Sequence, residues 1–324
     1  MKKAALILVS LALTLAVSCA APYRGAVEYA MGAEVTQTVW GAGEDCLKAA
    51  FDAIAALEED VSYRKDGGVA LLNSGGTLAS RGDAYDIIVK SAELWRDTGG
   101  AYDITVLPLV RAWGFDSGEP HIPAASELAS ALAITGGENI IFGADGIRLA
   151  NGAQIDLSAA GKGYACQKAV ETYKAYGASG GIVTVGGSVG VFGTKNGKNF
   201  RIAVRSPFDP ADAIAVLTLT DTYVSTSGSY EKRFFADGAE YHHLLDPSTG
   251  YPVHNGLISV TVVCGDGALS DMLSSACFCM GMEKSLPLLE KYSASALFVR
   301  EDGAVFVTKE LAPYVECESY EVLP

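Results

Sequence analysis

The segment from Asp156 to Tyr164, DLSAAGKGY, combines a carboxylate, small residues and a lysine at a predicted strand-to-helix turn. Small residues allow a ligand to approach the backbone closely. The first turn of a helix offers unpaired N–H groups and the positive end of the helix dipole, which suit a phosphate or an anionic ring. Lys162 adds a positive charge at the same place. The segment therefore predicts an anion-binding turn; the alternative is a surface turn with exposed glycine and lysine.

Asp271 and Ser275 stand four residues apart on a predicted helix, so their side-chain oxygens face the same direction. A carboxylate and a hydroxyl, with a backbone carbonyl as a further ligand, make a hard oxygen site that fits Mg²⁺. The alternative is a helix cap, because an aspartate near a helix start usually serves that role. The residues alone leave both interpretations open.

His243 is a candidate general base, because it lies next to apolar residues and shortly before Asp246. Upstream, the run Ser225–Ser227 offers hydroxyls that are able to hold phosphate oxygens. A histidine beside a strand is more often a satisfied core or surface residue, so the assignment depends on its neighbours in space.

The segment Gly100–Phe115 is rich in aromatic residues. Tyr102, Trp113 and Phe115 are able to stack on an aromatic ring. The alternative is a core strand that uses its aromatic side chains for packing.

Several common catalytic signatures are missing from the sequence. It has no GxSxG, no Walker A motif and no GxGxxG followed by a ribose-binding acid in a suitable context. Classical hydrolases, P-loop NTPases and hydride-transfer folds therefore lose support. The formal net charge of −14 argues against nucleic-acid binding, which needs clustered lysine and arginine.

The N-terminus resembles a bacterial lipoprotein signal. Lys2 and Lys3 precede an apolar run, Ala4–Val17, that is too short to span a bilayer alone, and Cys19 follows. We expect a signal peptide at residues 1–19, a tether at 20–30 and one catalytic unit at 31–324. The alternative for residues 20–35 is an entry strand. Lipidated Cys19 would anchor the protein to the cell membrane, facing the periplasm or the cell exterior. The alternative is an ordinary signal peptide.

Hydrophobic periodicity predicts helices and strands without strict βαβ alternation. The pattern indicates an α+β fold with largely antiparallel sheets and packed helices. The expected helices are 45–61, 83–97, 123–132, 160–176, 270–280 and 285–292. The expected strands are 139–149 as a hairpin, 153–157, 182–185, 189–192, 200–204, 214–219, 223–226, 242–245, 258–264, 296–299 and 305–308.

The order and spacing of these motifs together resemble the ApbE family of FAD:protein FMN transferases. The segments that carry the resemblance are Met31-Gly32-Ala33, Val61–Arg64, Gly100–Phe115, Asp156–Tyr164, Ser225–Tyr230, His243–Pro247 and Asp271. The resemblance implies a T-fold-related domain. It also implies that FAD is the substrate, that Mg²⁺ is the cofactor, and that FMN is attached to a Thr or Ser hydroxyl of an acceptor protein while AMP is released. The expected acceptor is an exported flavoprotein of membrane electron transport.

Carried over position by position, the resemblance implies roles for individual residues. The expected FAD contacts are Met31, Tyr63, Tyr102, Asp103, Ile104, Asp156, Lys162 and Leu245. The expected Mg²⁺ ligands are the Ala159 carbonyl, Asp271 and Ser275, and His243 and Asp271 are the expected catalytic residues. Departures from the family pattern are Ala33, Thr184, Ser188, Ser229 and Gln167. An FAD pyrophosphatase and a non-catalytic flavin-binding lipoprotein remain as alternatives.

Overall fold

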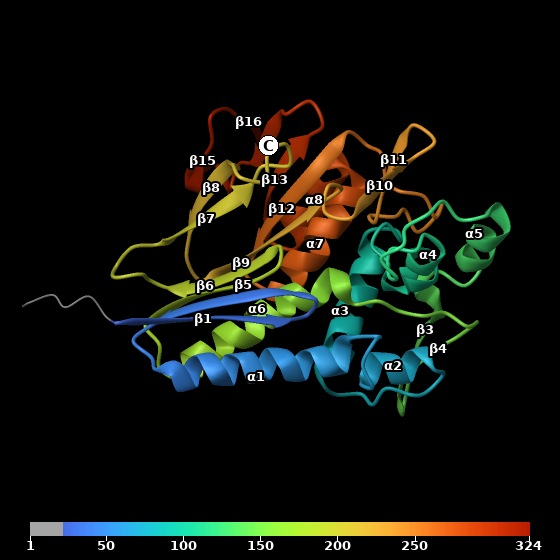
Figure 1. The fold of residues 1–324 in the computed structure, drawn as a ribbon, viewed down its shortest axis with the longest axis horizontal. Helices are drawn as coiled ribbons and strands as arrows, with labels where there is room; N and C mark the ends of the chain where they lie inside the picture. Colours follow the sequence, from blue (N-terminus) through green and yellow to red (C-terminus); the bar gives the residue numbers. More distant parts are fainter. Residues whose placement is uncertain (1–21) are drawn as a thin grey trace, which may run out of the picture.

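A nine-stranded sheet forms the centre of the computed structural model, which describes residues 22–324 (Figure 1). Its strand order is β1-β2-β5-β6-β9-β12-β13-β14-β16. Neighbouring strands are antiparallel throughout, except that β14 and β16 run parallel. The strands are β1 (Tyr23–Ala30), β2 (Ala33–Trp40), β5 (Gly180–Val185), β6 (Ser188–Gly193), β9 (Thr222–Gly228), β12 (Leu257–Cys264), β13 (Ser295–Arg300), β14 (Val305–Thr308) and β16 (Glu321–Leu323).

Helices cover one face of this sheet. The long helix α6 (Ser158–Ala175) packs on β5 and β6 and lies between α1 (Glu44–Val61) and α7 (Gly267–Met280). α1 buries residues such as Leu47, Ile54 and Leu57 at helical spacing, so one stripe faces the core. The remaining helices are α2 (Gly68–Asn73), α3 (Asp83–Asp97), α4 (Leu107–Ala112), α5 (Ala125–Leu132) and α8 (Met282–Lys291), with 3₁₀ turns at Ile104–Val106, Gly137–Asn139 and Ala312–Tyr314.

A small sheet of three strands, in the order β15-β8-β7, packs on the other face of the central sheet. Its strands are β7 (Phe200–Arg205), β8 (Ala213–Leu219) and β15 (Val315–Glu316). In β7 buried and exposed residues alternate, which is the period expected when one face of a strand meets the core. Two hairpins complete the fold: β3 (Ile140–Gly143) with β4 (Gly146–Leu149), and β10 (Arg233–Ala236) with β11 (Ala239–His242).

The predicted α+β class with largely antiparallel sheets is confirmed. Helix 83–97 is found with the expected bounds, and most other elements shift by a few residues. No helix within residues 22–324 has the length and apolar character needed to cross a membrane. The predicted signal peptide and Cys19 lie outside the described residues.

Of the two interpretations of the segment after residue 20, the entry strand is found: residues 23–30 form β1, because they pair along their whole length with β2. Three other local interpretations are wrong. Residues 153–157 form no strand, since the side chain of Asn73 takes both backbone groups of Ile155. Residues 100–115 do not form the core strand that was considered for them; they contain a 3₁₀ turn and α4. Pro108 lies in the first turn of α4, where proline is tolerated. The strand at 242–245 ends at His242.

Candidate active site

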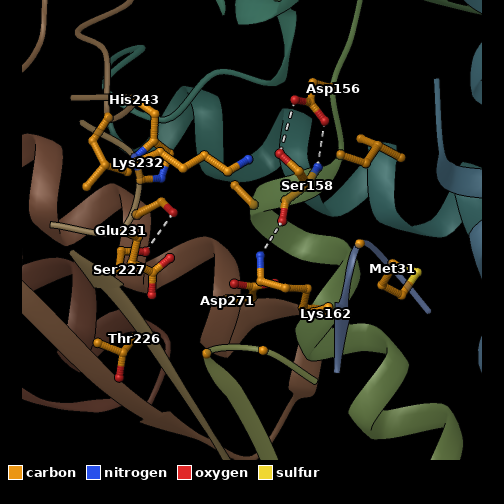
Figure 2. Close-up of a pocket in the computed structure, with 18 of the residues that line it drawn as sticks. Met31, Asp156, Ser158, Lys162, Thr226, Ser227, Glu231, Lys232, His243 and Asp271 are labelled. Carbon is orange, nitrogen blue, oxygen red and sulfur yellow. Dashed lines mark hydrogen bonds between the residues drawn. The ribbon is translucent and has the colours of Figure 1, made fainter. Parts of the chain in front are cut away.

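The twelve residues that the family resemblance assigns to catalysis, metal or FAD all line one cavity of about 1210 Å³. They come from loops and helices that are far apart in the chain and meet at the N-terminus of α6 (Figure 2). The predicted residues on its wall are Met31, Tyr63, Tyr102, Asp103, Ile104, Asp156, Ala159, Lys162, His243, Leu245, Asp271 and Ser275. The structure therefore brings the sequence-predicted set together, while the role of each residue stays a prediction.

The anion-binding turn is held rigid by its own hydrogen bonds. The backbone N–H of Asp156 donates to the carbonyl of Ile104 at 2.8 Å. The carboxylate of Asp156 accepts the N–H of Ser158 at 2.8 Å and its hydroxyl at 3.0 Å (Figure 2). Burial raises the pKa of Asp156, and the Ser158 donors and the charge of Lys162 oppose that rise. The result is a fixed carboxylate at the entrance to α6.

Lys162 stands in the first turns of α6 and points into the cavity (Figure 2). Its Nζ donates to the carbonyl of Ser158 at 2.9 Å. The negative charge of Asp271 is the main cause of the raised pKa of Lys162, and burial works against it. Lys162 therefore stays protonated and adds its charge to the positive end of the α6 dipole.

Asp271 connects the turn to the predicted metal site. Its Oδ2 accepts the backbone N–H of Gly163 at 3.0 Å, across 108 positions of sequence. A Cβ at Gly163 would lie 2.0 Å from the carbonyl oxygen of Gly267 and 2.8 Å from the Cβ of Asp271. Glycine at both crossing points lets α6 and α7 touch backbone to backbone. This close crossing sets Asp271 directly beside the Lys162 turn.

Hydroxyl groups of β9 and α7 form a ladder beside Asp271. The Oγ of Ser227 lies 2.7 Å from that of Ser274 and 3.0 Å from that of Ser275. Ser225 was grouped with Ser227 as a candidate phosphate ligand, but it is fully buried and bonds Ser270 at 2.9 Å. Ser225 is therefore structural, because its hydroxyl bonds Ser188 and Ser270 and it does not line the cavity.

His243 presents an imidazole without a protein partner at Nδ1, a buried atom with no hydrogen bond among the described residues. Its backbone N–H donates to the carbonyl of Lys232 at 3.1 Å. Burial lowers the pKa of His243 to about 3, and the positive charges of Lys232 and Lys162 add to the effect. The ring is therefore neutral at physiological pH, which is the form that accepts a proton.

The aromatic residues of 102–115 divide between cavity and core. Trp113 is fully buried, donates its Nε1–H to the carbonyl of Gly250 at 2.7 Å and is absent from the cavity wall. The prediction that Trp113 stacks on a ligand ring is therefore wrong. Tyr102 and Phe115 do line the cavity. Tyr63 also lines it, with the guanidinium of Arg64 5.0 Å from its ring centre.

Asp103 stabilises the cavity wall through hydrogen bonds to Thr105 and Gly137. Its Oδ1 accepts the N–H of Thr105 at 2.7 Å and its hydroxyl at 2.6 Å, and its Oδ2 accepts the N–H of Gly137 at 2.9 Å. Both oxygens have partners, so the Asp103 side chain is fixed in position at the cavity wall. Met31 has a left-handed backbone with a φ of 56° and packs its methyl group against Gly161 of α6.

Residues 31–298 match the ApbE family. The chain belongs to the ApbE family.

Relatives and solved structures agree with that assignment. The FAD:protein FMN transferase of Escherichia coli K12 is 30% identical over 264 residues, covering 76% of this chain and 74% of the relative. That of Salmonella typhimurium is 29% identical over 260 residues, covering 76% and 74%. The ApbE protein of Thermotoga maritima superposes with a TM-score of 0.84 at 29% identity, covering 90% of this chain and 99% of that one. The apo flavinyl transferase ApbE of Pseudomonas stutzeri gives a TM-score of 0.80 at 28% identity, covering 90% and 98%.

The donor atoms of this ApbE-family site fit a divalent cation that takes only a few of its ligands from the protein. Among residues 22–324 no three His, Cys, Asp or Glu side chains are grouped closely enough to hold a metal. Asp271 offers one buried carboxylate, Ser275 a hydroxyl and Ala159 a carbonyl at the start of α6. The Gly163 N–H, the usual helical partner of that carbonyl, donates to Asp271. Mg²⁺ commonly binds one or two carboxylates and takes its other ligands from substrate phosphate and water, so the donor set fits.

Sequence reasoning missed several charged residues of the ApbE-family cavity, among them Glu231, Lys232 and Arg205. Burial raises the pKa of Glu231, and the nearby charge of Lys162 opposes the rise. The available signal was the acid-base pair Glu231-Lys232 directly after Tyr230, next to Ser229, which is one of the departures from the family pattern. No signal pointed to Arg205, since it ends a strand of alternating pattern.

Replacing Gly163 tests the helix crossing. We expect Gly163→Ala to lower the free energy of unfolding by about 1–3 kcal/mol, because the new methyl group overlaps the Gly267 carbonyl. It should also weaken Mg²⁺-dependent stabilisation, since Asp271 is displaced. Urea unfolding with and without Mg²⁺ and FAD measures both effects. Gly265→Ala is the matched control, because a Cβ there meets nothing within 4 Å. Equal stability of the two variants would contradict the crossing.

Proposed function

We propose that this protein is an FAD:protein FMN transferase that uses Mg²⁺ to split the diphosphate of FAD and attaches FMN to a hydroxyl of an acceptor protein. The observation that carries the proposal is the 3.0 Å contact between Gly163 and Asp271. It places a buried carboxylate, a protonated lysine and a helix N-terminus around one point of the cavity. The names of the relatives support the same reaction.

The proposed step is a phosphoryl-centred displacement. The acceptor hydroxyl oxygen bonds to the FMN phosphorus, the bond from that phosphorus to the AMP phosphate oxygen breaks, and AMP leaves. His243 is neutral and takes the hydroxyl proton. Lys162 and the N–H groups at the start of α6 hold the phosphate oxygens. Asp271, Ser275 and the Ala159 carbonyl would hold Mg²⁺, which neutralises charge on the diphosphate and on the leaving AMP when bound.

The cavity wall supports flavin as the ligand. Tyr63, Tyr102 and Phe115 present aromatic surface, and Ile104 and Leu245 add apolar surface. The Arg64 guanidinium over Tyr63 fixes the orientation of that ring. These residues lie on the same cavity as the anion-binding turn, so a ligand with a flat ring and a diphosphate matches the wall.

Covalent flavin in membrane proteins tests the reaction. Cells of the source organism that lack this gene are complemented with the wild type or with Asp271→Asn, and membrane proteins are separated by denaturing electrophoresis. We expect flavin-fluorescent bands with the wild type alone, each carrying one added FMN by mass spectrometry. Turnover of FAD to FMN and AMP without any labelled protein would instead assign a pyrophosphatase. Bound FAD that never turns over would assign a flavin-binding protein.

We also propose that the protein is exported and anchored through Cys19. The basic pair Lys2-Lys3, the apolar run and the cysteine support this proposal. We expect Cys19→Ser to move the protein from the membrane fraction to the soluble fraction, because the acyl chains are the proposed anchor. Fractionation with radiolabelled palmitate measures it. The lipid anchor would be contradicted if Cys19→Ser stayed in the membrane fraction and the wild type took up no palmitate label.

A further inference from the structure

The cavity extends beyond the residues assigned to FAD and Mg²⁺, onto the face of the central sheet that carries the three-stranded sheet. This part, which we call the β7 lobe, lies between the central sheet and β7. Its wall consists of Thr184, Val189, Val224 and Thr226 from the central sheet and Ile202–Arg205 from β7. The reaction described above uses none of these residues.

β7 presents its edge to the lobe. It is the last strand in the order β15-β8-β7, so one of its edges has no neighbouring strand (Figure 1). Four consecutive residues, Ile202–Arg205, line the cavity. Consecutive residues of a strand point to opposite faces, so a cavity that touches all four runs along the strand edge. Such an edge offers backbone N–H and C=O groups to an incoming strand.

A glycine turn connects the β7 lobe to the reaction centre. Gly186 and Gly187 join β5 to β6, and both line the cavity. A Cβ on Gly186 would lie 3.4 Å from the Cδ of Lys162. A Cβ on Gly187 would lie 3.1 Å from the carbonyl oxygen of Thr226 and 3.5 Å from the Oε1 of Glu231. Side chains at these positions would narrow the passage, and glycine keeps it open.

The lobe has a cationic end in a protein of net charge −14. Arg205 lies on the exposed face at the end of β7. Within the part of the chain that the structure describes, it forms none of the arginine ion pairs. Its charge acts on the neighbouring side chains Tyr230 and Glu231. An unpaired guanidinium beside an open strand edge is suited to a carboxylate carried by an extended peptide.

We propose that the β7 lobe binds an extended acidic segment of the acceptor protein, which pairs with the free edge of β7. A carboxylate of this segment contacts Arg205. The Thr or Ser hydroxyl of the segment passes over the Gly186-Gly187 turn and reaches His243. The inference rests on the proposed function, because it names how the acceptor of that reaction is held. Main-chain pairing supplies affinity in this mode of recognition, and side-chain pockets supply specificity.

An oriented peptide library tests the proposal. The full-length protein, purified from membranes in detergent, receives FAD, Mg²⁺ and peptides of about 15 residues, long enough to follow a strand, with one central Thr and random flanks. Mass spectrometry identifies peptides that gain FMN. We expect Asp or Glu to be enriched at a fixed distance from the Thr. Arg205→Glu should shift the preference to Lys or Arg and lower kcat/KM for the acidic peptide by about 10- to 100-fold, with a much smaller change in KM for FAD.

Two controls make the test specific. Arg201→Glu reverses a charge on the same strand outside the cavity and should keep the wild-type preference. N-methylation of the selected peptide, one position at a time, should block labelling at alternate positions only, because every second N–H of a strand faces its neighbour.

Three results would overturn the inference. They are an unchanged preference in Arg205→Glu, a rise in KM for FAD equal to that for the peptide, and labelling of a folded acceptor domain without labelling of any peptide. The second result would assign the lobe to FAD. If the wild type labels no protein in cells, the proposed function itself fails.

Discussion

Asp271→Asn is expected to lower FAD turnover by on the order of 10³-fold while the fold persists, because it removes the carboxylate charge of the proposed metal site. The amide oxygen of asparagine still accepts the Gly163 N–H, so the contact between α6 and α7 is kept. The lost charge is the one that attracts a divalent cation. AMP release at saturating FAD and Mg²⁺ measures the effect.

A second aspartate on the same helix provides the matched control for Asp271→Asn. Asp266 caps α7, accepts the N–H of Leu269 at 2.9 Å and lies outside the cavity. Asp266→Asn keeps a capping side chain but loses the ion pair with Lys90, so it should cost about 1 kcal/mol of stability and keep turnover near that of the wild type. Thermal unfolding with increasing Mg²⁺ and FAD gives an independent readout, since only Asp271→Asn should lose the ligand-dependent rise in Tm. Retention of turnover within tenfold in Asp271→Asn would remove Asp271 from the reaction.

The sequence predicted which residues meet in one cavity more completely than it predicted the local structure around them. The turn at Asp156–Lys162 and the pair Asp271 and Ser275 were each ambiguous, because caps and surface turns use the same residues. Their order along the chain carried the resemblance to the ApbE family. What brings them together is the close approach of Gly163 to Gly267, a contact across 100 positions or more that no local pattern reveals.

The sequence-based errors share one physical cause: residue type does not show where in the fold a side chain lies. Trp113 and Phe115 are two positions apart, yet Trp113 is fully buried and Phe115 lines the cavity. Ser225 and Ser227 lie on the same strand face, but only Ser227 is near enough to its end to reach the cavity. Arg205 was missed because its importance depends on the free edge of β7, a property of strand order.

His243→Gln is expected to lower FMN transfer by about 10²- to 10⁴-fold, because it removes the group that we propose takes the acceptor proton. Glutamine keeps a polar side chain of similar reach, so FAD binding, measured by flavin fluorescence, should change much less. His254→Gln is the matched control, since His254 lies outside this cavity. Transfer at the wild-type rate in His243→Gln would assign proton removal to another group.

The pH dependence separates a buried base from an exposed one. An ordinary histidine loses its basic form below a pKa of about 6.5, whereas burial lowers the pKa of His243 to about 3. The kcat/KM for transfer, which reports the free enzyme, should therefore show no acid limb near pH 6.5 from this group.

His243→Gln should also change how the free energy of unfolding depends on pH. As pH falls below the unfolded pKa of about 6.5, the unfolded chain binds a proton at His243 that the folded protein refuses, so the wild type loses stability. His243→Gln removes that proton uptake and should flatten the fall in the free energy of unfolding between about pH 6.5 and 4. Urea unfolding across this range measures it. Two results together would contradict this: an acid limb near pH 6.5 in kcat/KM, and the same pH dependence of the free energy of unfolding in His243→Gln and the wild type. They would mean that the imidazole is hydrated and that burial does not keep it neutral.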